Sequence, residues 1–459
     1  MKRSAFLLKK RDSANFRSHL LRLLLAAAIF HVATTAVLFT VGRRAIRPDS
    51  FDANGVGVSF ASDGNGHRED AATLAEVLWS GGFHEWLTAA YPFHVKLYSI
   101  CFASFGVLLG FNIISAEPLN LFYYLGILIL VYTLGCEIFG WRSALIASVL
   151  VALWPTFVLH TTQFLKDPLF IFGMLALILI MTRLLRRSDT WSTALLRGTL
   201  GAVCAAVLWK SRPDMGPVVI ATITLGALLL VIRQFQTRPV QPSNLAGMAL
   251  LILISAVALL SLPVYRDADN PRVKTAASKE LPSNKKPKPI IRGWKLAAIA
   301  GIARQRFVEK YAGAGSNIDP YVKLTSTADL IRYLPRAVAI GMFAPFPNMW
   351  FETGSSVGLW GRVLAGFETL LTYVVELLAM VTLWRRRHEL SVWLLFSVAA
   401  MGITALGLVV VNVGALHRLR YLYLILLIIP AAATIEYLLD WSMKARSSNR
   451  RPANLEPAT

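Results

Sequence analysis

Long apolar segments constrain this chain more than any other feature of its sequence. Of its 459 residues 55% are hydrophobic and only 16% charged, and the mean hydropathy of +0.54 exceeds what a soluble core can hold. A helix crosses a hydrocarbon layer about 30 Å thick with roughly 20 apolar residues. We place such spans at about 19–41, 118–138, 143–160, 168–185, 194–209, 216–232, 245–264, 359–384, 391–412 and 420–440. The sequence therefore predicts an all-α polytopic membrane protein with about ten transmembrane helices.

The charge pattern favours a membrane surface as partner and no nucleic acid. The formal net charge is +21, but many Lys and Arg residues flank the apolar spans, where they can bind anionic headgroups of membrane lipids. Cys101, Cys136 and Cys204 all lie in apolar segments without a metal-binding spacing, so neither a disulfide framework nor a zinc site is expected. The first apolar run is too long for a signal peptide and lacks a clear cleavage site, so we expect a retained first span.

Arginine clusters decide the topology. Residues 92–113 are apolar enough to cross the membrane or to lie along its surface. If they do not cross, the Arg-rich short loops after 138, 185, 232 and 384 fall on the side of the basic N-terminus, as the positive-inside rule requires. We therefore expect a juxtamembrane helix at 92–113, both termini in the cytoplasm, and a location in a bacterial inner membrane. Pro335–Met349, a half-length apolar stretch broken by Pro345 and Pro347, is expected to be interfacial or re-entrant.

The predicted organisation has five parts. They are a basic cytoplasmic N-terminus at 1–18, a transmembrane module at 19–264 with its first extracytoplasmic loop at 42–117, an extracytoplasmic loop at 265–358, C-terminal transmembrane helices at 359–441 and a cytoplasmic tail at 442–459. In the second large loop, Ser278–Pro289 is rich in Lys and Pro and expected to be flexible, and Tyr311–Pro320 is expected to be a plain Gly-rich turn.

Three aspartates are candidate catalytic residues, because an enzyme acting on a lipid-linked donor needs a carboxylate to take a proton from the acceptor hydroxyl. Asp63 lies between small residues, where the backbone can turn sharply and present the side chain. Asp70 precedes a helical pattern and is equally a candidate helix N-cap. Asp167, followed by Pro168, can start a helix and still meet the first loop. Glu69 and His67 are interpreted as solvated loop residues, although either could assist a metal or a phosphate.

Cations for a leaving phosphate cluster on the same predicted outer face. His417, Arg418 and Arg420 begin the last span on the side that the positive-inside rule disfavours, which indicates anion binding. Lys210 and Arg212 form a second outer pair, for which phosphate binding and anchoring to headgroups are equally good readings. A divalent metal shared by Asp63 and Asp167 is possible, but no spacing in the sequence demands one.

Several segments together resemble a known family. The segments are residues 118–170, the pattern A-x-x-L-x-x-G at Ala75, Leu78 and Gly81, the stretch YPFHVKLYSICFASFG, and the run from Arg418 to Pro430. They are similar to the GT-C-type glycosyltransferases that use polyprenyl-phosphate sugars. This superfamily includes protein mannosyltransferases and the aminoarabinose transferase. The resemblance implies an inverting sugar transfer, a first-loop Asp as base (Asp63 or Asp70), a second acidic residue (Asp167), and arginines on the carrier phosphate (Arg418 and Arg420). The family's usual Asp position, eight residues before Ala75, holds His67 here.

The expected function is transfer of a sugar (a hexosyl or pentosyl group) from a polyprenyl-phosphate carrier to a glycan, lipid or protein acceptor on the extracytoplasmic face, in surface polysaccharide or glycoconjugate synthesis. Two alternatives remain open. One is a polymerase or ligase of the O-antigen type, which relies on Arg and His of large outer loops. The other is a transporter or flippase of lipid-linked sugars, although transporters place charged groups near the membrane midplane and often show repeated halves.

Overall fold

The computed structural model describes residues 2–44, 46, 51–52, 57–58, 63–236, 240–261, 295–351 and 358–448, with side chains from residue 18 to residue 445 apart from a few beside the gaps. Within these ranges the chain is helical except for turns and one two-stranded antiparallel ribbon, in which β1 (Phe51–Asp52) pairs with β2 (Gly57–Val58). The flexible stretch expected at Ser278–Pro289 lies outside the described residues.

Nine described helices are long and apolar enough to cross a membrane. They are α1 (Lys2–Arg43), α5 (Ile113–Ile138), α8 (Asp167–Arg186), α9 (Trp191–Ser211), α10 (Gly216–Gln236), α11 (Pro242–Ser261), α15 (Gly358–Arg385), α16 (Leu390–Val409) and α18 (Tyr421–Ser448). The helices α6 (Trp141–Ala152) and α7 (Pro155–Thr161) are apolar enough to cross only as a pair, and a bend of 68° between them, just before Pro155, makes the pair either a broken span or a re-entrant segment. The prediction of an all-α polytopic membrane protein is confirmed, with nine described spans, or ten if the bent pair crosses.

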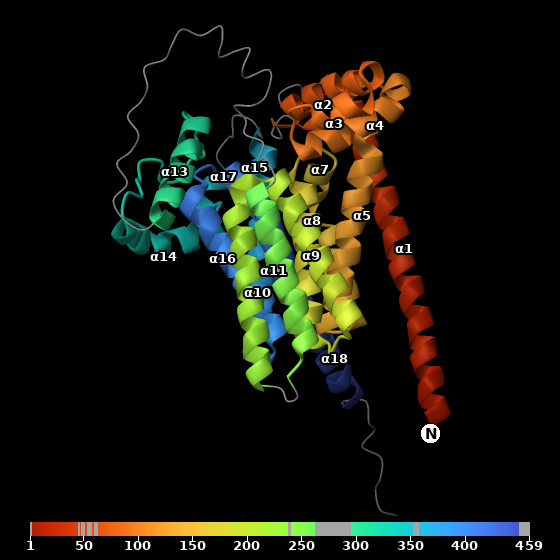
Figure 1. Cartoon of the computed structure of the whole chain (residues 1–459). Coiled ribbons are helices and arrows are strands. Elements are labelled where there is room, and N and C mark those ends of the chain that lie inside the picture. The colour runs from red at the N-terminus through yellow and green to blue at the C-terminus, as the bar shows by residue number, and fades with distance from the viewer. Residues whose placement is uncertain are drawn as a thin grey trace, which may run out of the picture.

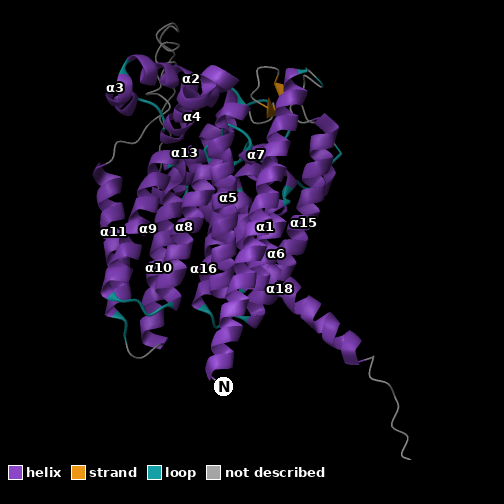
Figure 2. Ribbon diagram, turned by 90° about the vertical axis from the view of Figure 1, so that its right-hand side faces the viewer, coloured by secondary structure: helices purple, strands orange, loops and turns teal. Residues whose placement is uncertain are grey.

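Shorter helices gather at one end of the bundle, which we call the cap end. Its members are α2 (Asp63–Ser80), α3 (Gly82–Thr88), α4 (Phe93–Leu109), α13 (Lys295–Lys310), α14 (Thr327–Phe343) and α17 (Val413–Leu419). Figure 1 shows α2, α3 and α4 above α5 and α7, with α13 and α14 beside the top of α16. The apolar stretch at 92–113 forms the 17-residue helix α4 inside this cap, in agreement with a juxtamembrane position. The N-terminus and the end of α18 lie at the opposite end, called the far end (Figure 2).

The bundle is centred on α8, which is the most buried of the candidate spans. Its Leu, Ile and Met side chains face α5, α9, α10 and α16 in one continuous apolar core. In contrast, α1 leans on the outside of α5 and exposes most of its surface. A helix in that position contributes little to the core and depends on specific contacts.

A buried polar contact fixes α1 to the bundle. The Nδ1 of His31 lies 2.8 Å from an Oε of Glu117 on α5, and because a carboxylate only accepts, this nitrogen donates. Thr35 donates to the other Oε of Glu117 at 2.7 Å, and His31 Nε2 lies 3.1 Å from the hydroxyl of Thr161 on α7. All acceptors of Glu117 are thereby used within one cluster, as a low-dielectric position requires.

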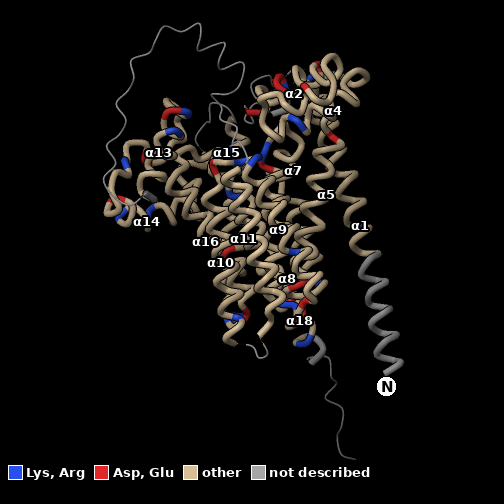
Figure 3. Tube along the Cα trace, in the orientation of Figure 1, with Lys and Arg blue, Asp and Glu red and all other residues tan. Residues whose placement is uncertain are grey.

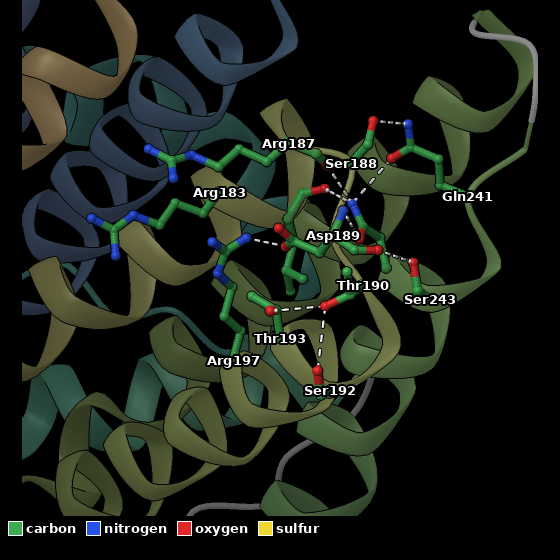
Figure 4. Close-up of polar contacts among 12 residues, drawn as sticks. Arg183, Arg187, Ser188, Asp189, Thr190, Ser192, Thr193, Arg197, Gln241 and Ser243 are labelled. Atoms are coloured by element: carbon green, nitrogen blue, oxygen red, sulfur yellow. Dashed lines mark hydrogen bonds and ion pairs between the residues drawn. The ribbon is translucent and has the colours of Figure 1, made fainter.

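At the far end, the turn between α8 and α9 is tied to α11 by side-chain contacts (Figure 4). Ser243 donates to the carbonyl oxygen of Asp189 at 2.7 Å, and Gln241 donates to the hydroxyl of Ser188 at 2.5 Å. The carboxylate of Asp189 also pairs with Arg197, one turn into α9. The turn is thus joined to α9 and to the start of α11 through side chains, and the carbonyl oxygen of Asp189 finds its partner in Ser243.

Glycines allow α14 to lie directly on α16, the helix that leads into α17. A Cβ at Gly407 would overlap the carbonyl oxygen of Ala337, and one at Gly341 would overlap that of Ile403. The two backbones therefore approach more closely than any larger residue permits. The close packing of α14 on α16 positions the cap helices next to them in the chain, α13 before α14 and α17 after α16.

We expect Gly407→Ala to lower the free energy of unfolding by about 1–3 kcal/mol, because the methyl group forces α14 and α16 apart. Thermal or denaturant unfolding of the purified protein in detergent measures this loss. Gly66→Ala is the matched control, since a Cβ at Gly66 of α2 meets nothing within 4 Å. Equal stability of the two variants would contradict the close approach.

Candidate active site

Asp63 is the first residue of α2 and faces two cations from distant parts of the chain. Its Oδ2 accepts a hydrogen bond of 2.8 Å from Nη2 of Arg418 on α17. Its Oδ1 accepts one of 3.1 Å from Nζ of Lys310, the last residue of α13. The cap helices α2, α13 and α17 thus meet at this carboxylate, which is only partly accessible.

Asp167, the first residue of α8, faces the same arginine from the other side. Its Oδ2 lies 3.2 Å from Nε of Arg418, and its Oδ1 pairs with Nη1 of Arg212. Both Asp167 and Arg212 are buried, and Arg212 also pairs with Asp214 at 3.4 Å. Arg418 therefore bridges two carboxylates with different nitrogens of one guanidinium group.

Opposing effects set the protonation of Asp63. Burial opposes its ionisation, but the charges of Arg418 and Lys310 and their hydrogen bonds outweigh burial and hold the pKa of the carboxyl well below its ordinary value. Asp63 is therefore a carboxylate at neutral pH. As long as both cations stay bound to it, it is a weak base.

Two histidines pack beside Asp63. His67 lies one turn after Asp63 on α2, and its Nδ1 donates to the carbonyl oxygen of Phe164 at 2.8 Å. Its ring meets that of His94 edge-on, with 4.5 Å between the ring centroids. Burial, followed for His94 by the charges of His67 and Lys166, lowers the pKa of both rings. Both are neutral at pH 7, so Nε2 of His67 bears a lone pair.

His94 is buried with both ring nitrogens lacking a hydrogen-bond partner among the described residues. It occupies the first turn of α4, directly after the N-cap Pro92. A buried unpaired imidazole is costly unless something binds it. The interpretation of His67 as a solvated loop residue is wrong, because it lies in a helix against His94.

A second polar cluster lies behind Arg418. His417 Nε2 is 3.0 Å from Oε2 of Glu368, and the backbone N–H of Thr156 donates to the other Oε of Glu368 at 2.7 Å. Glu368 of α15 thereby satisfies the N-terminus of α7 from another helix. Arg420 donates to the carbonyl oxygens of Met342 and Ala344 at 3.0 and 2.7 Å. These contacts hold α17 against α7, α14 and α15.

The structure brings some of the residues singled out in the sequence together and places others apart from them. It brings together Asp63, Asp167, Arg212 and Arg418. His417 and Arg420 are buried one layer behind, with protein partners. Lys210 is exposed at the end of α9, outside this cluster.

Asp70 is not a helix N-cap, because α2 begins seven residues earlier at Asp63. It is buried two turns into the helix. The polar, Gly-containing start of α2 concealed this earlier start, since it shows little helical periodicity. Asp70 thus lies further along α2 from Arg418 than Asp63 does.

Sequence reasoning missed Lys310, His94 and Glu368. Lys310 was hidden because residues 265–330 lack an apolar pattern and were expected to be a loop. In the structure α13 ends at Lys310, and the turn that follows pairs with the segment between α16 and α17, where the N–H of Ile318 donates to the carbonyl oxygen of Val411 at 2.8 Å. Glu368 carried a signal, since an acidic residue inside an apolar span is a functional or structural position by default.

Among the side chains that the structure describes, no group of three or more His, Cys, Asp and Glu is placed to hold a metal ion. Asp63 and Asp167 instead direct their carboxylates at one guanidinium group. The donor set therefore fits an arginine-bridged pair better than the shared divalent metal considered from the sequence.

Comparison with known proteins gives the fold. No protein-family model matches the sequence, and no curated protein does. The archaeal oligosaccharyltransferase AglB from Archaeoglobus fulgidus, solved with an inhibitory peptide and a dolichol-phosphate, superposes with a TM-score of 0.53 at 14% identity over 96% of this chain and 52% of that chain. The apo oligosaccharyltransferase of the same organism gives 0.53 at 12% identity over 96% and 53%.

The chain has a GT-C-like fold. At such low identity the likeness concerns the arrangement of helices alone. The chain also spans only about half the length of these two proteins. The superposition therefore covers about half of each of these two structures, and what those proteins act on is not transferred by it.

We expect Arg418→Met to lower the free energy of unfolding by about 3–5 kcal/mol, because two carboxylates lose their shared cation in a buried position. Adding Asp63→Asn and Asp167→Asn is expected to restore part of the loss. Denaturant unfolding in detergent measures both effects. Arg336→Met is the control, since Arg336 pairs with Asp319 at a half-exposed site, where about 1 kcal/mol or less is expected.

The lowered pKa of Asp63 predicts a pH dependence of stability. An unfolded Asp titrates near pH 3.9, so the stabilisation by ionised Asp63 is complete above that value and is lost as the pH falls toward the lower folded pKa. The difference in unfolding free energy between wild type and Asp63→Asn should stay constant from about pH 8 to 5 and shrink below about 4. A difference that changes between pH 6 and 8 would contradict this assignment.

Proposed function

We propose that this protein is a membrane glycosyltransferase that transfers a sugar from a polyprenyl-phosphate carrier to a hydroxyl of a glycan, lipid or protein acceptor. The observation on which the proposal depends is the cluster of Asp63, Asp167 and Arg418 at the cap end of a GT-C-like bundle. Arg212 and Lys310 complete it with two more cations. At one place these groups supply cations that can bind a phosphate dianion and a carboxylate that can accept a proton.

Asp63 is the proposed general base. In the transfer, the acceptor O–H proton moves to the Asp63 carboxylate while the acceptor oxygen bonds to the anomeric carbon. The bond between that carbon and the phosphate oxygen breaks, and its electron pair leaves on the polyprenyl phosphate. A single displacement of this kind inverts the configuration at the anomeric carbon.

Arg418 and Lys310 are proposed to exchange Asp63 for the donor phosphate. Without a donor, both cations are bound to Asp63 and depress its basicity. A phosphate that draws them away would raise the pKa of Asp63 and turn it into an effective base. Donor binding and activation of the base would then be one event. Asp167 would hold Arg418 in place throughout the exchange.

The likeness to a protein solved with a dolichol-phosphate supports a lipid-phosphate donor. The predicted topology would place the cluster on the extracytoplasmic face of a bacterial inner membrane, with both termini in the cytoplasm. Surface polysaccharide or glycoconjugate synthesis is the expected setting, since lipid-linked sugars are used on that face. The transferred group would be a hexosyl or pentosyl sugar.

We expect Asp63→Asn to lower the transfer rate by about 10²–10⁴-fold, the usual contribution of a general base. Membranes containing equal amounts of each variant are assayed for release of sugar from radiolabelled polyprenyl-phosphate sugars with a crude glycan acceptor. Asp167→Asn should lose activity through displacement of Arg418, and Asp70→Asn should lose less than Asp63→Asn. Glu69→Gln, exposed on the same helix, is the matched control.

Other outcomes would favour the alternatives. Normal transfer by all three aspartate variants, or movement of the intact lipid across the bilayer by the wild type, would refute the proposal and favour a transporter. Retained activity of Asp63→Asn together with loss in His417→Ala would favour a polymerase or ligase of the O-antigen type.

A further inference from the structure

The far end of the bundle contains a cavity that the proposed transfer does not use. It has a volume of about 330 Å³ and lies between the end of α15, the start of α6 and residues 433–440 of α18. Ionisable side chains of both signs line it, and Figure 3 shows basic and acidic residues together near α18 at this end. A cavity of this size can hold the polar headgroup of a lipid, and its lining decides which headgroup fits.

The two signs of charge lie on different helices. Arg385 is the last residue of α15 and Arg386 follows it in the turn, whereas Glu436 and Asp440 lie one turn apart on α18. In the described part of the chain no ion pair joins either arginine to Glu436 or Asp440. Charges that line one cavity without pairing across it can each receive the opposite charge of a ligand.

The existing partners of these residues leave binding capacity. Arg385 stacks on the ring of Tyr437, with 3.4 Å from its guanidinium carbon to the ring centroid, and the structure gives it no carboxylate partner. Asp440 is only loosely paired, at 3.7 Å from Arg142. Glu436 accepts from the hydroxyl of Ser143 through one oxygen. The guanidinium group of Arg385, the loosely paired carboxylate of Asp440 and the second oxygen of Glu436 therefore remain available to bind a ligand.

Aromatic residues place the cavity at the depth of lipid headgroups. Trp141, Trp384, Tyr437 and Trp441 are all exposed around it. Exposed Trp and Tyr side chains at the ends of spans mark the boundary between hydrocarbon and water. A ligand in this cavity can keep its charged group at that boundary while its apolar chains extend into the hydrocarbon.

We propose that this cavity binds the headgroup of a phospholipid with a primary amine, as in phosphatidylethanolamine. The phosphate lies against Arg385, with Arg386, which already pairs with Glu389, beside it, and the ammonium group donates to Glu436 and Asp440. An anionic headgroup would leave Glu436 without a cation and Asp440 with only its 3.7 Å contact to Arg142. A choline headgroup cannot donate hydrogen bonds, and the aromatic face that could bind it is already covered by Arg385.

The test is native mass spectrometry of the full-length protein in detergent, titrated with phosphatidylethanolamine, phosphatidylcholine and phosphatidylglycerol of equal chain length. We expect the ethanolamine lipid to bind about tenfold more tightly than the other two, as one or two charge-assisted hydrogen bonds predict. This comparison needs only the wild type. Equal binding of the three lipids would overturn the proposal.

Variants assign the site. Glu436→Gln with Asp440→Asn should abolish the preference for ethanolamine over glycerol headgroups while keeping phosphate binding, and Arg385→Gln should weaken all three lipids. Arg387→Gln is the matched control, because Arg387 lies in the same turn but does not line the cavity, and its side chain donates to the carbonyl oxygen of Trp384 and stacks on that ring. An equal loss in Arg385→Gln and Arg387→Gln would refute the cavity as the site.

Competition with soluble glycerophosphoethanolamine distinguishes binding of a whole lipid from binding of a free headgroup. If it competes with the lipid at equal concentration, the cavity binds the small molecule and the membrane assignment is wrong. If it does not compete, the acyl chains contribute as the position of the cavity requires. These outcomes do not depend on whether the protein transfers sugars.

Discussion

The shared position of Arg418 between Asp63 and Asp167 is the interaction on which the cap end depends. Its guanidinium group joins the start of α2 to the start of α8, and Lys310 brings the end of α13 to the same carboxylate. Elements that are far apart in the chain therefore meet through charge rather than through an apolar core. Such a cluster tolerates few substitutions, because removing one member leaves a partly buried charge without a partner.

The same arrangement explains how a ready site can be kept inactive. A carboxylate held by two cations is ionised but weakly basic, so the proposed base cannot act until an anion competes for those cations. Glu368 binds His417 and the backbone of Thr156 behind it, and so ties α17 to α7 and α15. In the proposed exchange these buried contacts would keep α17 in place while Arg418 changes its partner.

Both ends of the bundle carry charged side chains close to the apolar spans. At the cap end, the charges neutralise one another within the protein. At the far end, Arg385 and the carboxylates of α18 line a cavity without pairing with one another. That difference is what makes the far end a candidate for a ligand of mixed charge.

The sequence by itself determined the membrane-spanning helices and the side on which the loops gather. Length, apolarity and the asymmetry of arginines suffice for that, because hydrocarbon forces each apolar segment of about 20 residues to satisfy its own backbone as a helix. It also singled out Asp63, Asp167, Arg212 and Arg418, since ionisable groups are rare in so apolar a chain. Only the tertiary structure decided that Arg418 pairs with both aspartates, that Arg420 and His417 face inward, and that Lys310 and His94 join the site. Those choices depend on how short cap helices pack, and packing between segments hundreds of residues apart leaves no periodic signal in the chain.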